Sequence, residues 1–420
     1  MRVARRRASP LSHTSLFQFR QPAFWLYAAI VGLTGWATMV QQGLFRQISP
    51  EGWALSWALL LLYAAPVVAV ILVLDLYERE PTSLLVGALV WGGVAATTLA
   101  GIANSGWGLV VADLGGPGFA AKWTAALTAP FVEETLKGLG VVLIYLIARR
   151  EVDDVMDGFV YGALVGLGFA VVEDVFYFMA VFGGRPGGVL QGFFLRVLSS
   201  GLYSHVLYTG LVGMGVGYVV SRRDDTPRRR RLAVAAGLSA IAVFGHFLWN
   251  SPLLDLFPPA PWTGSDLIVV PLAAAVKGLP LLLFVGVAVA LARGRERRWL
   301  HGTLAGEVRS GGITARELAD LEDPRRRRRA RRAMRTRAGE RAARLLGRLQ
   351  GEQLELAGVR AAVARDDDPA LIEQRAFCRS LRDALMALPG AAPAEIEAGL
   401  PPGGVLPGTA LPGPTSGPDR

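Results

Sequence analysis

The sequence contains a single cysteine, Cys378, among its 420 residues. One cysteine excludes an intramolecular disulfide framework and a cysteine-based zinc site. Charged residues are also few, at 19% of the chain, whereas 52% of the residues are hydrophobic and the mean hydropathy is +0.37. No cleavable signal peptide is expected, because the first apolar run lacks a small-residue cleavage site. We therefore predict a polytopic membrane protein with an attached polar segment.

Long apolar runs make up most of the first 292 residues. Eight runs are long enough to cross a hydrocarbon core of ~30 Å as helices. They cover residues 22–42, 53–74, 83–104, 123–148, 158–182, 189–220, 232–251 and 267–292. We predict an all-α fold, in which residues 22–292 form a bundle of about eight transmembrane helices.

Basic residues are scarce in alternate loops. The loops after the fourth, sixth and eighth runs carry Arg clusters, as does the segment before the first run; they lie at 149–150, 222–231, 293–298 and 2–20. The loop after the second run is acidic, and acidic residues contribute little to orientation. The opposite loops carry little beyond Arg46, Lys122 and Arg185. The positive-inside rule then places residues 1–21 and the C-terminus in the cytoplasm.

The composition changes abruptly after Ala292. Residues 293–389 are Arg-rich, with helical apolar spacing at 345, 346, 349, 354 and 356. We predict a small cytoplasmic helical region there, followed by a disordered Pro/Gly-rich tail at 390–420. Because the Arg cluster at 325–335 is tethered beneath a membrane, we expect it to contact anionic lipid headgroups or solvent, and no nucleic acid.

The fourth apolar run contains Glu133, Glu134 and Lys137. One charge at the centre of such a helix costs at least ~2.5–3.5 kcal/mol on insertion scales, and such residues usually mark a functional site. A structural salt bridge between Glu133 and Lys137, four residues apart on one helical face, is the plainer interpretation. It leaves Glu134 unexplained, and so we favour a functional cluster.

Further ionisable residues lie in later runs. Glu173 and Asp174 stand in the fifth run, His205 in the sixth, and His246 in the seventh, one turn before Asn250. Counted at ~1.5 Å per residue from the outer ends, Glu133 and Glu173 lie ~15 Å deep, His246 ~8–9 Å and His205 ~22 Å. We predict that these groups converge between the middle and the outer half of the bundle.

The charges in the spans do not balance. The four acids Glu133, Glu134, Glu173 and Asp174 face two bases, Lys137 and Lys277, and Arg196 is expected near the interface. Protonated carboxylates or a divalent cation would remove this deficit. Carboxylates with imidazoles could bind zinc, with Glu133, Glu173, His205 and His246 as candidate ligands.

This residue set suits hydrolysis. Either a metal-bound hydroxide or a water deprotonated by a glutamate could attack a peptide carbonyl, and Asn250 could donate a hydrogen bond to the oxyanion. The candidate catalytic residues are Glu133, Glu134, Glu173, His246 and Asn250. Both the zinc mechanism and the metal-free mechanism stay open at this point.

The same stretches resemble the PrsW family of bacterial intramembrane proteases, which is related to the CAAX prenyl endopeptidases. Residues 133–137 match its Glu-Glu-x-x-Lys motif, residues 157–173 its second motif, and His205 and residues 246–250 its histidine motifs. The resemblance implies a metalloprotease of the bacterial cell membrane, making site-1-type cuts in membrane proteins such as anti-sigma factors. The CAAX enzymes have His where this chain has Glu173, so their proposed metal-free mechanism does not transfer directly.

Two other functions remain as alternatives. A transporter or proton-coupled carrier also uses intramembrane Glu, Lys and His residues. It would carry inverted repeats, and the sequence has no convincing internal repeat. A non-catalytic scaffold would tolerate the loss of Glu133 and Glu134 but not of the Arg-rich region.

Overall fold

The computed structural model describes residues 15–75, 80–149, 151–222, 226–254 and 266–391. These residues form helices, turns and bends, without a strand, which confirms the predicted all-α class. The chain divides into two compact units, Met1–Arg298 (the membrane unit) and Trp299–Arg420 (the C-terminal unit). Most of the predicted basic N-terminus (1–14) and nearly all of the predicted disordered tail (392–420) lie outside the described residues.

Six helical stretches among the described residues are long and apolar enough to cross a membrane, and they confirm a multi-pass helical protein. They are Pro22–Ile48 (α1), Pro50–Leu74 (α2), Thr82–Gly115 (α3, η1 and α4), Val155–Val181 (α6 and η2), Arg228–Asn250 (α9) and Ile268–Arg309 (most of α10). The other two predicted spans correspond to α5 (Pro117–Ile147), which carries the charged cluster, and to the shorter α8 (His205–Ser221).

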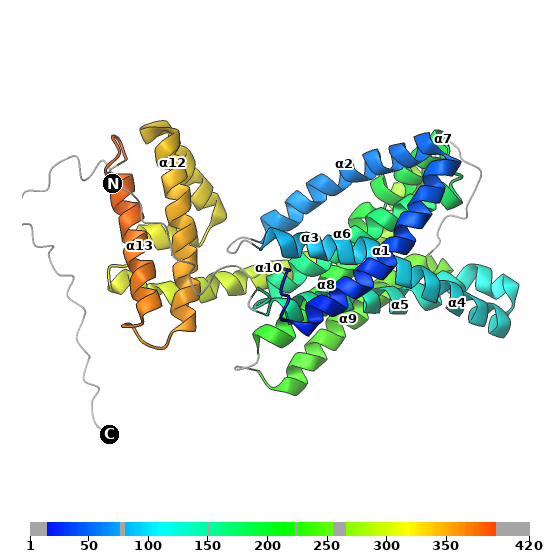
Figure 1. The fold of residues 1–420 in the computed structure, drawn as a ribbon, viewed down its shortest axis with the longest axis horizontal. Helices are drawn as coiled ribbons and strands as arrows, with labels where there is room; N and C mark the ends of the chain where they lie inside the picture. Colours follow the sequence, from blue (N-terminus) through cyan, green and yellow to red (C-terminus); the bar gives the residue numbers. More distant parts are fainter. Residues whose placement is uncertain (1–14, 76–79, 150, 223–225, 255–265, 392–420) are drawn as a thin grey trace, which may run out of the picture. The chain divides into compact units, whose positions relative to one another are not determined.

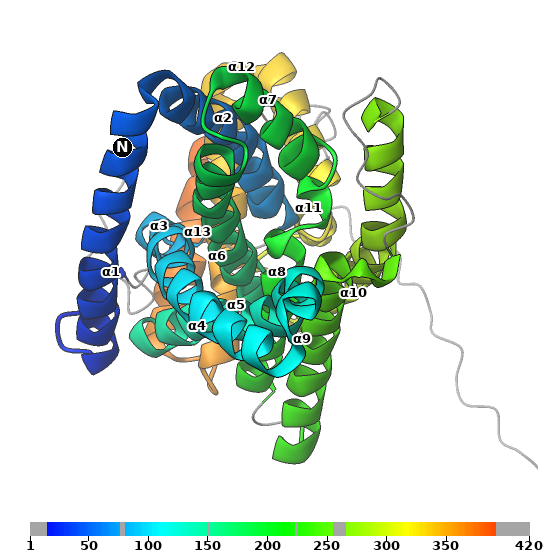
Figure 2. The ribbon, with the colours of Figure 1, turned by 90° about the vertical axis from the view of Figure 1, so that its right-hand side faces the viewer.

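Helix α6 (Val155–Phe176) is buried along almost its whole length, and it packs most extensively on α8. Small residues allow this close approach. A Cβ atom on Gly162 would lie 2.3 Å from the carbonyl oxygen of Thr209, and one on Gly166 only 2.2 Å from that of His205. Glycines on α6 therefore bring the first residue of α8 against the centre of the bundle. Figure 2 shows α1 and α9 on opposite sides of α6.

The predicted sixth span, residues 189–220, is not one helix. It consists of α7 (Pro186–Gly192), the π-helix η3 (Phe193–Leu198), the short 3₁₀ turn η4 (Gly201–Tyr203) and α8. Ser200 Oγ donates to the carbonyl oxygens of Leu195 and Arg196, and Ser204 Oγ donates to that of Gly201. Serine hydroxyls that bond to nearby backbone compete with continued helix. The depth count of ~22 Å for His205 assumed a continuous helix, and that assumption was wrong.

Two more π-helices lie in the membrane unit. In the third span, η1 (Trp91–Ala96) joins α3 (Thr82–Val90) to α4 (Thr97–Gly115) and packs on α6. At the end of α6, η2 (Tyr177–Val181) continues the helix. Helix α5 packs against α4, α9, α6 and α8, and this arrangement sets its charged face among helices far apart in sequence. The short 3₁₀ turn η5 (Pro252–Leu254) follows α9.

The C-terminal unit contains the end of α10 (Asp266–Arg309), then α11 (Ala315–Leu321), α12 (Pro324–Ala362) and α13 (Pro369–Met386). Helices α12 and α13 run side by side (Figure 1). Gly339, with a φ of 84°, joins two helical segments within α12, a conformation that glycine adopts without strain. Leu349 and Leu356, from the predicted apolar pattern, are buried, as are Cys378 and Leu381 of α13.

Candidate active site

One turn of α5 carries three buried ionisable side chains. Glu133, Glu134 and Lys137 are 3%, 2% and 0% exposed. The Lys137 ammonium donates to Glu133 Oε2 at 3.1 Å and to Glu134 Oε1 at 2.9 Å. The structure therefore contains the Glu133–Lys137 salt bridge of the plainer interpretation, but Glu134 shares the same base. One positive charge between two carboxylates leaves a net negative charge inside the bundle.

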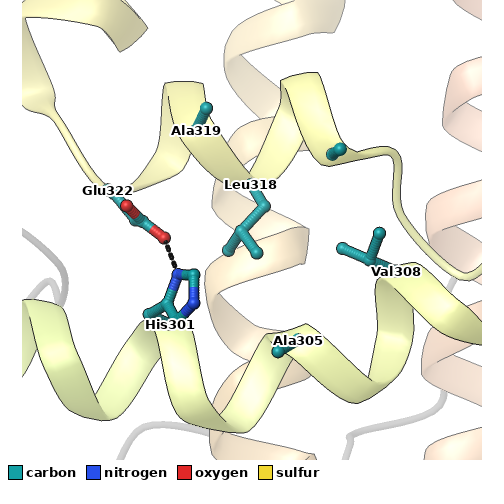
Figure 3. A pocket seen from close by; sticks show the side chains of 7 residues that line it. His301, Ala305, Val308, Leu318, Ala319 and Glu322 are labelled. Atoms are coloured by element: carbon teal, nitrogen blue, oxygen red, sulfur yellow. Dashed lines mark hydrogen bonds and ion pairs between the residues drawn. The ribbon is translucent and has the colours of Figure 1, made fainter. Parts of the chain in front are cut away.

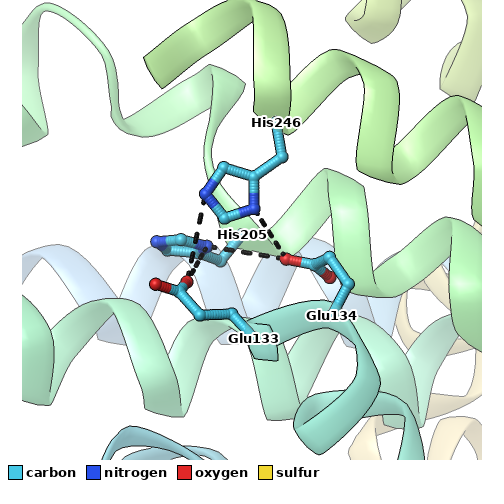
Figure 4. Close-up of side chains that lie close together, drawn as sticks. All are labelled: Glu133, Glu134, His205 and His246. Atoms are coloured by element: carbon cyan, nitrogen blue, oxygen red, sulfur yellow. Dashed lines mark hydrogen bonds and ion pairs between the residues drawn. The ribbon is translucent and has the colours of Figure 1, made fainter. Parts of the chain in front are cut away.

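Two histidines complete this cluster. His205 begins α8 and His246 lies in the last turns of α9, and each is buried. One donor atom from each of Glu133, Glu134, His205 and His246 lies within 4.8 Å of the others. Figure 4 shows the two imidazoles facing the two carboxylates. The predicted convergence of α5, α8 and α9 therefore occurs, and Glu134 belongs to the potential ligand set.

Each histidine is oriented by a carboxylate. His246 Nδ1 lies 3.1 Å from Glu134 Oε1, and His205 Nε2 lies 3.1 Å from Glu173 Oε2. A carboxylate accepts hydrogen bonds, so these ring nitrogens carry the protons. The Tyr208 ring stacks on His246 with centroids 4.9 Å apart. The imidazole planes are thus held by packing as well as by hydrogen bonds.

Glu173 lies behind His205, outside the four-residue set. Arg196 donates to Glu173 Oε2 at 2.8 Å and to Asp174 Oδ1 at 2.5 Å, and its expected position near the interface stays a prediction. The Arg196 side chain is 28% exposed, and its guanidinium also lies over the Tyr177 ring. The break before α8 gives the physical reason, because it lets η3 place Arg196 beside the end of α6. The structure thus makes Glu173 a partner of His205 and Arg196.

Three contacts were not anticipated from the sequence. Asn104 Nδ2 donates to Glu133 Oε1 at 3.1 Å, and Thr209 Oγ1 donates to Glu134 Oε2 at 2.9 Å. The Lys137 ammonium lies 3.8 Å from the centroid of the Phe169 ring. Asn104 was the polar residue that ended the third predicted run, and Thr209 stands four residues after His205. These two sequence positions were the signals from which the two polar contacts could have been predicted.

Asn250 and Lys277 form hydrogen bonds with backbone oxygens. Asn250 Nδ2 donates to the backbone oxygen of Ala125 at 3.3 Å, so its amide faces the backbone of α5. Lys277 Nζ contacts the backbone oxygens of Trp249 and Ser251 at 3.4 and 3.5 Å. A cation at the carbonyl end of a helix stabilises that end. Lys277 therefore interacts with the end of α9.

The donor chemistry fits a divalent metal. Two carboxylates and two imidazoles are ligands that zinc accepts, and all four side chains are buried. Hydrogen bonds to Glu173, Asn104 and Thr209 would orient the ligands from outside, as outer groups do at known metal sites. The set differs from the predicted one by including Glu134 and leaving out Glu173.

The C-terminal unit has a groove of a different kind. Its volume is about 320 Å³, and it is lined by apolar side chains of α10 and α11 with the pair His301–Glu322 at one end. Figure 3 shows His301 Nδ1 pointing at Glu322, at 2.5 Å. His301 is largely exposed, and the groove brings only this one acid and one imidazole together. It offers no counterpart of the cluster on α5.

Comparison with known proteins bears on the membrane unit. The sequence model described as PrsW family intramembrane metalloprotease matches residues 80–279. This stretch, just under half of the chain, is similar to the PrsW family. It contains every residue of the cluster, from Asn104 to His246, together with Glu173 and Arg196.

Two curated PrsW proteins are similar to this chain. Protease PrsW of Bacillus subtilis (strain 168) is 31% identical over 103 residues, which cover 24% of this chain and 44% of that protein. Protease PrsW of Geobacillus kaustophilus (strain HTA426) is 27% identical over 185 residues, covering 44% of this chain and 67% of that protein. The chain thus spans between about two fifths and two thirds of these relatives. No solved structure matches the chain significantly.

Proposed function

We propose that this protein is an intramembrane endopeptidase that hydrolyses peptide bonds of membrane-protein substrates. The observation that carries the proposal is the convergence of Glu133, Glu134, His205 and His246, with donor atoms within 4.8 Å, inside a multi-pass helical bundle. The PrsW-family description supports the same reaction class. By analogy with that family, we propose site-1-type cleavage, with an anti-sigma factor as one candidate substrate.

Glu133 is the better placed general base. The two oxygens of Glu134 accept from Lys137, His246 and Thr209, whereas those of Glu133 accept from Lys137 and Asn104. A carboxylate offers about four lone-pair positions, so Glu133 keeps more capacity for a further donor. A base must lie within hydrogen-bond reach of the proton that it removes.

The geometry around Glu133 suits a nucleophilic water. His246 Nε2 lies 3.9 Å from Glu133 Oε2. Because His246 Nδ1 donates to Glu134, Nε2 holds a lone pair, and both atoms are acceptors. A water that donates one O–H to each would be polarised for attack, with its proton passing to Glu133 Oε2. A polar gap of this length is one that water can bridge.

A divalent metal, for which zinc is the best chemical match, would be held by Glu133, Glu134, His205 and His246. When bound, such an ion supplies Lewis acidity, polarising a carbonyl and lowering the pKa of a bound water. The protein contributes the orientation: Glu173 fixes His205 and Glu134 fixes His246. Arg196 in turn donates to Glu173 and so holds the carboxylate that orients His205.

We also propose that both termini are cytoplasmic and that the Arg-rich face of α12 contacts anionic headgroups. Arg325, Arg326, Arg328 and Arg329 are exposed on this helix. Each basic residue near an anionic membrane surface contributes about 1 kcal/mol to the attraction. Reporter fusions after residues 150, 223 and 295 should all give a cytoplasmic signal, and an external signal at 223 would contradict this topology.

The decisive test is cleavage of a single-pass membrane substrate by the full chain in liposomes. Glu133→Gln, Glu134→Gln and His246→Ala should each lower kcat/KM by at least about 100-fold, the scale of losing a general base. Glu51→Gln, at the exposed N-terminus of α2, is the matched control and should cleave normally. Normal cleavage by all three site variants would refute the protease function and favour a scaffold or carrier.

Metal dependence needs its own measurement. Elemental analysis of the purified protein should find a divalent ion, and exhaustive chelation should abolish cleavage until the ion is restored. Cleavage that persists through chelation would instead support a water activated by Glu133 alone.

A further inference from the structure

The ammonium of Lys137 is completely enclosed by the groups that would bind a metal. Its nitrogen lies 2.7 Å from His205 Nδ1, 2.9 Å from Glu134 Oε1 and 3.1 Å from Glu133 Oε2. An ammonium has three N–H donors, and each therefore has one acceptor. Phe169 presents its ring to the same nitrogen, and Lys137 is 0% exposed. The lysine occupies the place of a cation coordinated by the cluster.

The tautomer of His205 makes this occupancy exclusive. His205 Nε2 faces Glu173 Oε2, which only accepts, so Nε2 carries a proton. Nδ1 faces an ammonium, which only donates, so Nδ1 supplies its single lone pair to Lys137. A nitrogen that accepts a hydrogen bond through its single lone pair cannot bind a metal at the same time. His205 can therefore ligate a metal only after Lys137 has moved away.

The carboxylates point to the same conflict. The oxygens that receive Lys137 are Glu133 Oε2 and Glu134 Oε1, while the opposite oxygens accept from Asn104 and Thr209. Neutral outer donors thus turn one oxygen of each carboxylate toward a shared centre, and the lysine holds that centre. The donor arrangement suits one cation at a time.

We propose that Lys137 is a tethered competitor of the metal: its ammonium and a divalent cation are alternative occupants of one position. This inference rests on the metal-assisted form of the proposed function. Without metal, the lysine compensates the charge of the two carboxylates. Metal loading requires the side chain to withdraw, so the lysine lowers the affinity of the site and makes loading a gated step.

The test compares zinc affinity in the full-length protein in detergent, by equilibrium dialysis followed by elemental analysis. Lys137→Met removes the competing charge at nearly constant volume and should tighten zinc binding at least about 10-fold, a scale on which groups beside a metal change its affinity. Lys277→Met is the matched control, because that lysine contacts backbone oxygens at the end of α9, and its affinity should equal the wild type. Unchanged or weaker binding by Lys137→Met would overturn the proposal.

Two further variants keep the result unambiguous. Lys137→Leu offers no sulfur ligand and should show the same gain in zinc affinity. It also replaces Lys137→Met in the test if that variant does not fold. Adding His246→Ala to either variant should abolish the gain, and a gain that persists would place the metal elsewhere and refute the proposal. Cleavage by the wild type, measured in the same preparation, separates the outcomes. If the wild type cleaves the substrate but neither Lys137 variant binds zinc more tightly, the competition is rejected and the protease function stands.

Discussion

Buried carboxylates occur in both units of the molecule, but they are neutralised in different ways. In the C-terminal unit Glu307 is 1% exposed, and one guanidinium, that of Arg375, donates to both of its oxygens at 2.7 and 2.8 Å. In the membrane unit one ammonium is shared by Glu133, Glu134 and His205. The first arrangement is a paired and geometrically saturated ion pair. The cluster around Lys137 has fewer positive charges than carboxylates, and it has several groups that can accept a proton.

This difference separates a charge that only holds the fold together from a charge that is available for a reaction. A bidentate arginine leaves a carboxylate little capacity for anything else, so the Glu307–Arg375 pair can only hold α10 and α13 together. A shared lysine leaves carboxylate and imidazole lone pairs directed at a common centre, where water or a metal can bind. Burial alone does not mark a candidate active site, and our proposal rests on incomplete neutralisation beside histidines.

The largest effect on stability should come from breaking the saturated pair. Arg375→Met removes the bidentate partner of the buried Glu307 carboxylate and leaves Arg360 Nε 3.9 Å from Oε1, so it should destabilise the C-terminal unit by up to about 3–5 kcal/mol. Hydrogen exchange of the full chain, followed at amides of α12 and α13, measures this loss. Arg382→Met is the matched control, because its partner Glu317 is 19% exposed and water can replace the contact. Equal losses in the two variants would show that burial of Glu307 is unimportant.

An intermediate effect, on activity, should come from Glu173. Glu173→Ala removes the partner of His205 Nε2 and should lower kcat/KM by about 10–100-fold, as for outer carboxylates that orient histidines. Asp174→Ala also removes an Arg196 contact but none to His205, so its loss should be several-fold smaller. If the two variants were equally impaired, the role of Glu173 would lie in holding Arg196.

The smallest effect concerns a carboxylate that has only a structural role within the membrane unit. Asp154 caps α6, accepting from the backbone nitrogens of Met156 and Asp157. Asp154→Ala should cost about 1 kcal/mol of stability. Burial raises the pKa of Asp154, which means that ionisation at neutral pH disfavours the fold. Asp154→Asn keeps the cap and should therefore equal or exceed the wild type at pH 7 in thermal unfolding. A loss like that of alanine would contradict the capping role.

Much of the membrane unit was predictable because charge in an apolar run is costly and therefore conspicuous. Glu133, Glu134, Lys137, His205 and His246 were all identified from the sequence, and the structure brings them together. Their depth was harder to predict, since the hydroxyls that end the helix before His205 belong to serines that a hydropathy count treats as tolerable. The break at 199–204 was missed for this reason.

The outer contacts could not be assigned from sequence spacing. Asn104, Thr209 and Arg196 reach the cluster or Glu173 from other helices, through packing that no local pattern encodes. The roles of Glu173 and Asn250 depended on side-chain direction, which periodicity fixes only to a helical face. The helical character of the C-terminal unit followed from its leucine spacing, but the pairs Arg375–Glu307 and Arg382–Glu317 join residues more than sixty positions apart.

The central claim is that the incompletely neutralised cluster performs chemistry and the saturated pair maintains structure. It is tested most directly by measuring cleavage and hydrogen exchange together for Glu134→Gln and Arg375→Met in the full chain. Glu134→Gln should lose at least about 100-fold in kcat/KM while its exchange protection is retained. Arg375→Met should lose protection in α12 and α13 while its kcat/KM stays within a few-fold of the wild type. Full activity in Glu134→Gln, or loss of cleavage in Arg375→Met with the membrane unit still protected, would contradict the account.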